Sequence, residues 1–493
     1  MKKLLTILAA LIISASNVAQ AQDCLWAKSE GGISPDNDTK VCADVSGNIY
    51  VTGRFFSSTI TFGATTLNNF GQSDIFVTKY TSDGTLIWTK SAGGNGMDIC
   101  KSVSTDPSGN VYITGSFSST FTIGSTTLTS AGSSDAFLVK YDPNGTFLWA
   151  KSAGGTFTDY GQSISTDSSG NLYVTGNFES PTITFGSTTL SNEGREDIFI
   201  VKYSPDGAVL WAKAAAGNEY DKANGISTDV NGSVYVVGRF NSTTITFGTT
   251  NLINADNSDG TNDIFITKFA SDGSVLWAKS VGGLYDEDGS DVSTDPSGNV
   301  FITGNFSSPV ITFGTTTLFN TENGANSYSD IFIAKYTPNG TFIWAKSAVG
   351  NGYDIGQGIS TDAIGNVFVT GSFYGSTITF GTTTIVNTDI GTNDNSDIFI
   401  AKYSGVSTGT SESSANNQLI ISPNPTNSSI TLSMPSLKNS KISITTLTGT
   451  EVGNYNTENT STQTIDISHL ASGVYFVSLK SEEGVLTKKI IKQ

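Results

Sequence analysis

The chain has 493 residues, of which 14% are charged, 37% hydrophobic and 10% aromatic, and it contains 53 glycines. This composition is typical of a protein rich in strands and turns, and it excludes a helical bundle, which needs more Leu, Ala, Glu and Lys. Lys and Arg number 26 against 43 Asp and Glu, a formal net charge of −17, which disfavours binding to a nucleic-acid backbone. The single histidine, His469, excludes a histidine-based catalytic pair from most of the chain.

Residues 1–21 have the features of a secretory signal peptide. Lys2 and Lys3 form a positive start, and the apolar stretch Leu4–Ala15 is too short to span a bilayer. Ala19–Ala21 reads Ala-Gln-Ala, a small-x-small cleavage site. We therefore expect a mature chain that starts at Gln22, has no transmembrane segment and is exported through the periplasm.

Six tryptophans mark a repeat that runs through most of the chain. Successive tryptophans are 62, 61, 62, 66 and 67 residues apart. Around each one the same phrases return in the same order, for example Ser-Ile-Ser-Thr-Asp, Gly-Asn-Leu-Tyr-Val-Thr-Gly-Asn-Phe and Asp-Ile-Phe-Ile-Val-Lys-Tyr. A repeat of this length indicates a series of similar structural units. The tryptophans are Trp26, Trp88, Trp149, Trp211, Trp277 and Trp344.

Each phrase is predicted to form one strand. The phrases are short, rich in β-branched and aromatic residues, and bounded by Gly, Asn, Asp or Pro. Four main strands per repeat, with an extra hairpin from the Thr-Ile-Thr-Phe-Gly phrase, would make an antiparallel sheet with two apolar faces. A radial arrangement buries both faces and leaves only short edges, so the sequence predicts an all-β fold, a β-propeller.

The number of phrases predicts the number of blades. The first three strand phrases occur six times, and the last set ends near Tyr403. The Trp phrase also occurs six times, but its first copy, Cys24–Ser29, precedes every other strand, and the last set has none after it. We therefore predict a six-bladed propeller over residues 22–404 in which the N-terminal strand completes the sixth blade. An open solenoid with a frayed first strand is the alternative.

The repeats resemble a known family. Asp-x-x-Gly-Asn-Val-Tyr-Val-Thr-Gly, Asp-Ile-Phe-Ile-x-Lys-Tyr and Asp-Gly-x-x-x-Trp are similar to the bacterial β-propeller repeats called SBBP, over about Gln22 to Tyr403. The resemblance implies a propeller fold, and members of the family mostly lack an assigned activity. The family name refers to seven blades, so a seven-bladed ring stays open beside the count of six.

A second module is expected at the C-terminus. Residues 405–418 are rich in Ser, Thr, Gly and Asn without an apolar pattern, which is typical of a flexible linker. Residues 419–493 contain short alternating stretches, such as Lys441–Thr446 and Val474–Leu479, and predict a small β-sandwich.

In this second module, the start Ser-Pro-Asn-Pro at residues 422–425 and the run Leu-Ala-Ser-Gly-Val-Tyr at residues 470–475 resemble the type A sorting domain of the type IX secretion system. The resemblance implies that it engages the outer-membrane secretion machinery and delivers the protein to the surface of a Gram-negative bacterium, or releases it, after which the module is cleaved or exchanged for an anchor. The alternative is a β-sandwich binding module. The residues assigned to the sorting motif are Pro423, Asn424, Pro425, Gly473, Tyr475, Lys488 and Lys489.

The repeats offer little to support catalysis. They contain no histidine, and their aspartates recur at equivalent turns, where an aspartate capping its own turn explains the repetition better than catalysis does. Only three arginines, Arg54, Arg195 and Arg239, are present. The sequence therefore favours a non-catalytic recognition module for a glycan or a protein. The alternative is a carboxylate-dependent enzyme that degrades polysaccharide on a propeller scaffold.

Calcium is the candidate ion. Asp286, Asp288 and Asp291 lie around a glycine, and residues 256–263 form a second run of oxygen-bearing side chains. Hard cations prefer such oxygen ligands. A solvated acidic loop is the alternative at both places.

Differences between the repeats point to a binding surface. The connection before the Asp-Ile-Phe phrase is short in the first three repeats and long in the last three, over Ile253–Asn262, Phe319–Ser329 and Val386–Ser396. Function often lies in loops on a rigid scaffold, so we predict an acidic, Asn-rich half-face that binds a neutral glycan or a cation-bridged partner. The candidate binding residues are Asp256, Asp259, Phe319, Glu322, Tyr328, Asp389 and Asp394.

Overall fold

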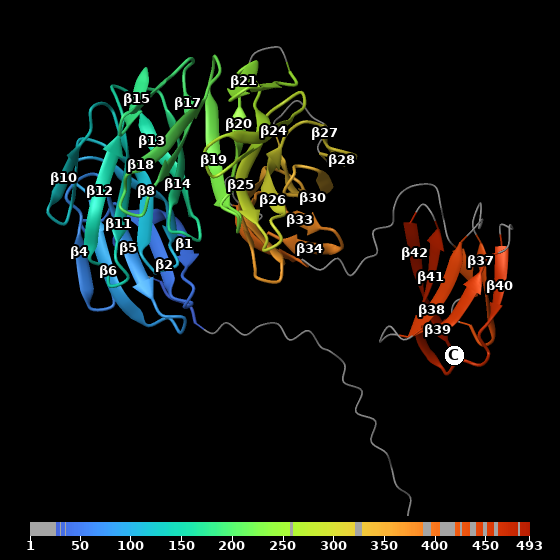
Figure 1. Cartoon of the computed structure of the whole chain (residues 1–493). Helices are drawn as coiled ribbons and strands as arrows, with labels where there is room; N and C mark the ends of the chain where they lie inside the picture. The colour runs from blue at the N-terminus through green and yellow to red at the C-terminus, as the bar shows by residue number, and fades with distance from the viewer. Residues whose placement is uncertain are drawn as a thin grey trace, which may run out of the picture. The chain divides into compact units, whose positions relative to one another are not determined.

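The structure is a computed structural model that describes residues 26–29, 31–34, 36–256, 260–320, 328–387, 396–404, 420–423, 426–433, 440–446, 451–457, 462–481 and 484–493. Within these residues all regular structure is β, with 42 strands and no helix (Figure 1). Accordingly, this part of the chain holds no helix with the length and hydropathy of a membrane span. The chain divides into two compact units, one ending at Tyr403 and one beginning at Ser404.

The first unit, called the repeat unit below, consists of six antiparallel sheets that follow one another along the described chain and are numbered blades 1 to 6. Each blade runs from an inner to a second, a third and an outer strand. The inner strands are β1 (Asp36–Ala43), β7 (Asp98–Thr105), β13 (Asp159–Thr166), β19 (Asp221–Thr228), β25 (Glu287–Thr294) and β31 (Asp354–Thr361). The second strands are β2 (Ile49–Phe55), β8 (Val111–Phe117), β14 (Leu172–Phe178), β20 (Val234–Phe240), β26 (Val300–Phe306) and β32 (Val367–Phe373).

The third and outer strands complete the blades. The third strands are β5 (Asp74–Tyr80), β11 (Asp135–Tyr141), β17 (Asp197–Tyr203), β23 (Asp263–Phe269), β29 (Asp330–Tyr336) and β35 (Asp397–Tyr403). The outer strands, each of which carries a repeat tryptophan, are β6 (Leu86–Ala92), β12 (Phe147–Ala153), β18 (Val209–Ala215), β24 (Val275–Val281) and β30 (Phe342–Gly350).

An extra hairpin lies between the second and third strands of every blade, as the sequence predicts. Its exposed threonines face each other across the two strands, and Thr61 and Thr66 have hydroxyl oxygens 3.1 Å apart. In blade 6 the hairpin also pairs with β30 of blade 5. The hairpins are β3 (Thr59–Phe62) with β4 (Thr65–Asn68), β9 (Thr120–Ile123) with β10 (Thr126–Thr129), β15 (Thr182–Phe185) with β16 (Thr188–Ser191), β21 (Thr244–Phe247) with β22 (Thr250–Ile253), β27 (Val310–Phe313) with β28 (Thr316–Phe319), and β33 (Thr377–Phe380) with β34 (Thr383–Val386).

Threonine hydroxyls link the inner strands of successive blades. The Thr105 hydroxyl donates to the carbonyl of Ala43 (3.3 Å), and the Thr166 hydroxyl donates to the carbonyl of Thr105 (2.8 Å). Blades 4, 5 and 6 repeat this bond through Thr228, Thr294 and Thr361, at 2.7–3.0 Å. The Ser-Thr pair of the inner-strand phrase therefore joins each blade to the one before it.

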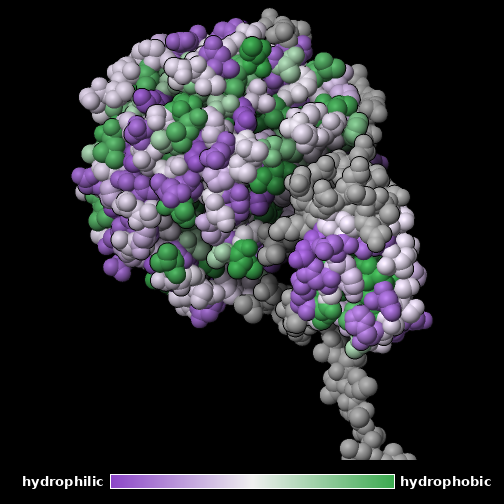
Figure 2. All heavy atoms as spheres, turned by 45° about the vertical axis from the view of Figure 1, so that its right-hand side comes forward, coloured by the Kyte–Doolittle hydropathy of each residue, from purple (hydrophilic) through white to green (hydrophobic). Residues whose placement is uncertain are grey.

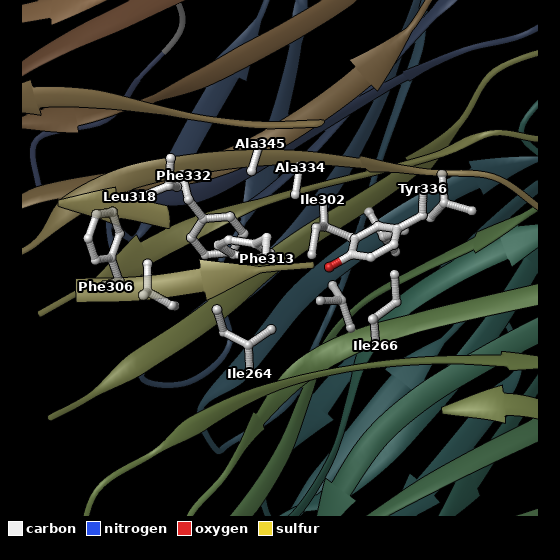
Figure 3. Close-up of a cluster of buried hydrophobic side chains, with 14 of the residues drawn as sticks. Ile264, Ile266, Ile302, Phe306, Phe313, Leu318, Phe332, Ala334, Tyr336 and Ala345 are labelled. Carbon is white, nitrogen blue, oxygen red and sulfur yellow. The ribbon is translucent and has the colours of Figure 1, made fainter. Parts of the chain in front are cut away.

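The hydrophobic core lies in the seams between blades. Figure 3 shows the seam between blades 4 and 5, where Ile264 and Ile266 of β23 face Ile302, Phe332 and neighbouring side chains of blade 5. All of these side chains are buried. The third strands β11, β17 and β23 are buried along their whole length because a blade packs on each of their faces. β5 is buried by blade 2 on one face and by its own hairpin and Trp26 on the other.

The N-terminal segment differs from the prediction. Cys24 and Leu25 lie outside the described residues, and Trp26–Ser29 form no strand, so within the described residues blade 6 has three strands and no pairing that closes the ring. Consequently Ile398 and Ile400 of β35 are 82% and 75% exposed, although the equivalent residues of the other third strands are buried. The hydroxyl link is also missing at this seam, because residue 43 is alanine where the other blades have threonine.

The second unit is a pair of sheets with a core of its own. One sheet has the order β36-β37-β40 and the other β39-β38-β41-β42, and buried isoleucines from both, such as Ile430 and Ile442, form one cluster. The strands are β36 (Ile420–Ser422), β37 (Ser429–Ser433), β38 (Lys441–Thr446), β39 (Glu451–Asn456), β40 (Thr462–Asp466), β41 (Gly473–Ser481) and β42 (Gly484–Lys492).

Candidate binding face of the repeat unit

The strand register gives the repeat unit two unlike faces. Phe55, the last residue of β2, pairs with both Asp36 and Asp74, the first residues of β1 and β5. The long connections around the hairpins and the connections from each outer strand to the next inner strand therefore emerge together, on what we call the loop face. The opposite face, the turn face, holds the tight turns after the inner strands and after the third strands.

Recurring aspartates hold the tight turns of the turn face. Asp106 accepts hydrogen bonds from the backbone N–H groups of Ser108 and Asn110 (both 2.9 Å), from the Asn110 side chain (2.7 Å) and from the Tyr112 hydroxyl (2.8 Å). Gly109 has a φ of +78°, a conformation that glycine adopts without the steric cost that a Cβ brings. Equivalent aspartates make the same backbone bonds, which supports their interpretation as turn caps.

The recurring lysines and tryptophans tie each blade to the next turn. The Lys268 ammonium and the Trp277 indole N–H both donate to the carbonyl of Pro338 in the following blade, at 3.1 and 3.2 Å. Lys268 also lies 4.8 Å from the centre of the Tyr235 ring and 3.5 Å from a carboxylate oxygen of Asp229. The same residue types repeat this arrangement at other seams, so they are structural.

The loop face departs from the repeat in blades 3 to 5. The second residue of the inner strand is isoleucine in blades 2 and 6 (Ile99 and Ile355) but Tyr160, Lys222 and Asp288 in blades 3, 4 and 5. Each side chain is partly exposed toward the centre of the face. We call these three residues, with the neighbouring Asn177, Glu196, Asn224 and Arg239, the polar crescent.

One half of the polar crescent is centred on Glu196. This carboxylate is almost completely buried, yet it accepts a hydrogen bond from the Tyr160 hydroxyl (2.6 Å) and lies 2.9 Å from the Lys222 ammonium. Burial and the Glu196 charge raise the pKa of Tyr160, so the hydroxyl stays protonated and acts as a donor. The buried charge is thus balanced within the site.

The other half of the polar crescent is centred on Asp288. Its carboxylate accepts hydrogen bonds from the Arg239 guanidinium (2.8 Å) and from the Asn224 side-chain amide (2.7 Å). Burial raises the pKa of Asp288, although the attraction of Arg239 opposes this shift. Asn224 also donates to the carbonyl of Gly289, so the amide is held in one orientation across two blades.

Aromatic side chains surround the polar crescent on the same face. Four successive connections from an outer strand to the next inner strand each expose one ring, and the turn after β32 exposes another. The exposed fractions lie between 41 and 52%. The Tyr353 and Tyr374 rings contact each other edge to face, with ring centroids 6.3 Å apart and ring planes at 62°. These rim aromatics are Phe157, Tyr220, Tyr285, Tyr353 and Tyr374.

Buried carboxylates lie beneath the loop face at the seams. The first residue of an inner strand donates its backbone N–H to the residue before the third strand of the preceding blade, as Glu287 does to Asn262 (2.8 Å). Burial raises the pKa of Glu287 to about 8 and that of Asp98 to about 8, and the carboxylates of Asp263 and Asp74 across the respective seams add to this shift. These groups are therefore protonated or poorly ionised at neutral pH.

The binding residues predicted from the long connections are only partly within the described structure. Asp259, Glu322, Asp389 and Asp394 lie outside the described residues. Phe319 and Tyr328 are exposed on the loop face, Phe319 to 64% and Tyr328 to 49%, and Asp256 lies at the base of its connection. Buried asparagines after the hairpins hold these bases; Asn320, for example, donates to the carbonyl of Tyr328 (2.9 Å).

The three aspartates predicted to bind calcium are engaged separately. Asp286 accepts hydrogen bonds from the backbone and side chain of Asn262 (3.0 and 2.7 Å), Asp288 belongs to the polar crescent, and Asp291 accepts a hydrogen bond from the backbone N–H of Ile359 (3.0 Å). Among the described residues no group of three or more His, Cys, Asp or Glu side chains is placed to hold a metal ion.

The predicted sorting motif is spread over both sheets of the second unit. Gly473 begins β41, and the nearly buried Tyr475 donates its hydroxyl to the carbonyl of Ala471 (2.9 Å). Pro423 and Lys488 are exposed. Asn424 and Pro425 lie outside the described residues, and Lys489 is placed in β42 without a described side chain.

Sequence reasoning missed the polar crescent and the rim aromatics. Tyr160, Lys222 and Asp288 stand where two other repeats have Ile, and Glu196 stands where four of the other five repeats have Ser, so an alignment of the six repeats would have exposed these differences. The motifs that recur are structural, whereas these residues break the recurrence.

Comparison with known families agrees with this architecture. The family described as "Beta-propeller repeat" (SBBP) matches residues 87–116 and 148–177, and the family described as "Secretion system C-terminal sorting domain" matches residues 421–493. The chain is thus an all-β protein built from propeller repeats and ending in a secretion sorting domain. The sorting domain indicates export to the cell surface or secretion, and it implies an interaction with the type IX secretion machinery.

Curated relatives share only part of their length with this chain. An uncharacterised WD repeat-containing protein of Acanthamoeba polyphaga mimivirus is 25% identical over 443 residues, covering 71% of this chain and 31% of the relative. The regulatory protein FlaEY of Caulobacter vibrioides is 27% identical over 248 residues, covering 46% of this chain and 25% of the relative. The chain therefore spans about a third of the mimivirus relative and a quarter of the Caulobacter relative.

Solved structures are similar only at a low level. A puromycin hydrolase mutant complexed with PGG has a TM-score of 0.33 and 8% identity, covering 81% of this chain and 58% of the hydrolase. A structural genomics protein of unknown function from Bacteroides thetaiotaomicron has a TM-score of 0.20 and 12% identity, covering 69% of this chain and 96% of that protein.

Proposed function

We propose that the repeat unit is a non-catalytic recognition module that binds a glycan or a protein on its loop face, and that the C-terminal unit delivers it to the outside of the cell. The division is a signal peptide over residues 1–21, a propeller over 22–404, a linker over 405–418 and a sorting domain over 419–493. The loop face supports recognition because three departures from the repeat coincide on it.

These departures fall in overlapping blades. The polar crescent occupies blades 3 to 5, and the rim aromatics follow from blade 3 to blade 6. The connection before the third strand has five residues in blades 1 to 3 but nine or ten in blades 4 to 6. The stability of a repeat fold needs none of these departures, and binding residues concentrate in variable loops on a rigid scaffold.

The seven predicted binding residues belong to this proposal. Asp256, Asp259, Phe319, Glu322, Tyr328, Asp389 and Asp394 all lie in or beside the long connections. Asp286, Asp288 and Asp291 would contribute hydrogen-bond acceptors, with a calcium-bridged ligand as the second arrangement to test.

Shortening the connections tests this role. The mature chain is compared with a variant whose three long connections are replaced by the five-residue connection of blade 1, residues 69–73. The matched control exchanges the connections of blades 1 and 2, which are equal in length. Both proteins are applied to immobilised polysaccharides and surface proteins, with and without calcium, and released reducing sugar is measured in the same samples.

We expect the variant to fold and to lose retention, while the control keeps it, and no sugar to be released. Equal retention of the variant would show that the long connections are not part of the binding site. Release of reducing sugar would favour the alternative, a polysaccharide-degrading enzyme.

We further propose that the N-terminal segment closes a six-bladed ring. Trp26 donates its indole N–H to the carbonyl of Ser82 (3.0 Å), and a Cβ on Gly84 would lie 2.7 Å from the indole, as every outer-strand tryptophan packs on the next blade. Trp26 therefore occupies the place of an outer strand of the blade before blade 1, which in a closed ring is blade 6. Closing the ring would pack blade 1 against Ile398 and Ile400, as blade 5 packs against the equivalent Ile264 and Ile266, and burying an isoleucine contributes about 1.5–3 kcal/mol.

Removal of residues 22–29 tests closure. We expect aggregation or a large fall in Tm, because β35 keeps an exposed edge and the seam loses its tryptophan. A truncated protein with unchanged thermal unfolding would show that the segment is a loose tail.

Removal of residues 419–493 tests delivery. The second unit has its own core, so the repeat unit should still fold but fail to reach the cell surface. Normal amounts of the truncated protein at the surface would contradict the sorting role.

A further inference from the structure

From the chemistry of the loop face we infer that its ligand is an uncharged glycan chain, which lies along the rim aromatics of blades 3 to 6 and is held by hydrogen bonds from the polar crescent. This inference rests on the proposed recognition role and names the class of ligand. It follows from the exposed rings of the rim aromatics, from the paired charges of the polar crescent and from the net charge of the repeat unit.

The rim offers flat apolar surfaces in a row. Phe157, Tyr220, Tyr285 and Tyr353 come from four successive connections, one or two residues before the inner strand, so neighbouring blades each carry a ring. Blades 1 and 2 have Ile33 and Met97 near the corresponding places. Aromatic rings are rigid, lose little conformational entropy on binding and stack on flat apolar faces such as the C–H faces of pyranose rings. A row across several blades suits a chain of sugars better than a single sugar.

The cations of the loop face are already paired. Lys222 lies 2.9 Å from Glu196, Arg239 lies 2.8 Å from Asp288, and Arg195 lies 3.0 Å from Glu219. A charged ligand would have to displace one of these partners and leave its charge unpaired, which is costly in a partly buried site. An uncharged hydroxyl can instead accept a hydrogen bond from one of the other N–H groups of the five-donor Arg239 guanidinium and donate to the Asp288 carboxylate.

The charge of the unit disfavours a polyanion. With the two lysines of the leader and the six of residues 405–493 set aside, 18 of the 26 basic residues remain, against 37 of the 43 acidic residues. The resulting negative field repels acidic polysaccharides and nucleic acids alike. An uncharged polymer with many hydroxyl groups satisfies all three conditions.

A comparison of polysaccharide classes tests the ligand class. The mature chain is run in affinity gels that contain neutral polysaccharides (xyloglucan, arabinoxylan, laminarin or mannan) or acidic ones (alginate, hyaluronan or polygalacturonate), and in parallel over immobilised surface proteins. We expect retardation by at least one neutral polysaccharide. The retardation should change less than about twofold between low and high salt, since no ion pairs form with the ligand.

Single variants locate the site. Tyr285→Ala and Tyr353→Ala should each weaken binding about three- to tenfold, and the double variant should weaken it by roughly the product, because each removes one stacking surface. The matched control is Phe70→Ala, which removes a 67% exposed ring from the loop face of blade 1, outside the row. Circular dichroism and Tm confirm that the variants fold.

The outcomes separate the two proposals. Retardation only by an acidic polysaccharide or a protein, lost in the tyrosine variants, would overturn the ligand class and leave the recognition role standing. Binding of neutral polysaccharide that Phe70→Ala weakens as much as Tyr285→Ala would overturn the location of the site. The absence of any retained partner would overturn both proposals.

Discussion

The turn face and the loop face of the repeat unit use the same residue types for different purposes. On the turn face, lysine, tryptophan and aspartate recur in register, and each satisfies a backbone group of its own turn or of the next blade. On the loop face, the residue type at a given strand position differs from blade to blade. Its partly exposed lysine and arginine side chains form ion pairs with carboxylates of neighbouring blades. Recurrence therefore accompanies a structural role, and its interruption accompanies a surface that is free to vary.

Carboxylates show the contrast most clearly. Burial opposes the ionisation of Asp362 on the turn face, but hydrogen bonds from Asn366 and the backbone of Ile364 outweigh it and lower the pKa of Asp362. Beneath the loop face, burial dominates and raises the pKa of Asp221 to about 7 and that of Glu287 to about 8. The turns thus hold their charges with directed N–H groups, whereas the seams under the loop face hold carboxyl groups that ionise with difficulty.

The largest expected effect comes from a seam tryptophan. Trp277→Ala removes a ring that packs 6.0 Å from the Tyr235 ring and covers Gly340, where a Cβ would lie 2.9 Å from the indole. We expect a loss of about 3 kcal/mol in the free energy of unfolding, measured by urea denaturation.

The matched control for this variant is Leu276→Ala on the same strand, since Leu276 is 54% exposed. It should change stability by less than about 0.5 kcal/mol. Equal losses of unfolding free energy in the two variants would show that Trp277 stabilises the seam no more than an exposed residue of the same strand does.

The seam carboxyl groups predict an unusual pH dependence. The pKa of Glu287 is raised from 4.5 to about 8 in the folded chain, so between these values the folded protein holds a proton that the unfolded chain has lost. Stability from this group is complete below pH 4.5 and is lost as the pH rises toward 8, with a limiting slope of about 1.4 kcal/mol per pH unit.

Glu287→Gln should flatten this decline, because the amide oxygen can still accept from the backbone N–H of Ser308. Asp362→Asn on the turn face should have the opposite effect on the pH dependence. The lowered pKa of Asp362 stabilises the folded wild type at neutral pH, and this stability is lost as the pH falls, so the variant should lack that acid-sensitive contribution. Tm values measured between about pH 4 and pH 9 check both, and an unchanged slope in Glu287→Gln would contradict the assignment.

A smaller effect is expected at a surface cleft between blades 2 and 3. The cleft is open to solvent, has a volume of about 380 Å³ and is lined by Val209, Phe185 and Tyr203, among others. Phe147 and Phe342 begin the outer strands of blades 2 and 5 where Val209 begins that of blade 3. Val209→Phe should therefore add about 1 kcal/mol of stability, measured by urea denaturation. A loss of stability would indicate that the space closes around valine and that the larger ring overpacks it.

The amino-acid sequence by itself determined much of this protein. The spacing of Trp88, Trp149 and Trp211 and the phrases around them gave the blades, their strand order and the hairpins, because each strand carries its own β-forming residues and turn signals. The turn role of Asp106 also followed, since an aspartate caps a turn through groups two to four residues away. The change in composition after Tyr403 and the motif around Tyr475 indicated the sorting domain.

Only the tertiary structure decided which side chains meet. Tyr160 and Glu196 are 36 residues apart, and Arg239 and Asp288 are 49 residues apart, so their contacts depend on how neighbouring blades pack and on which end of each strand lies at the loop face. No pattern within a few residues of sequence predicts which of these side chains come into contact. The contact of the Trp26 indole with the carbonyl of Ser82, 56 residues further along the chain, is of the same kind and shows only in three dimensions.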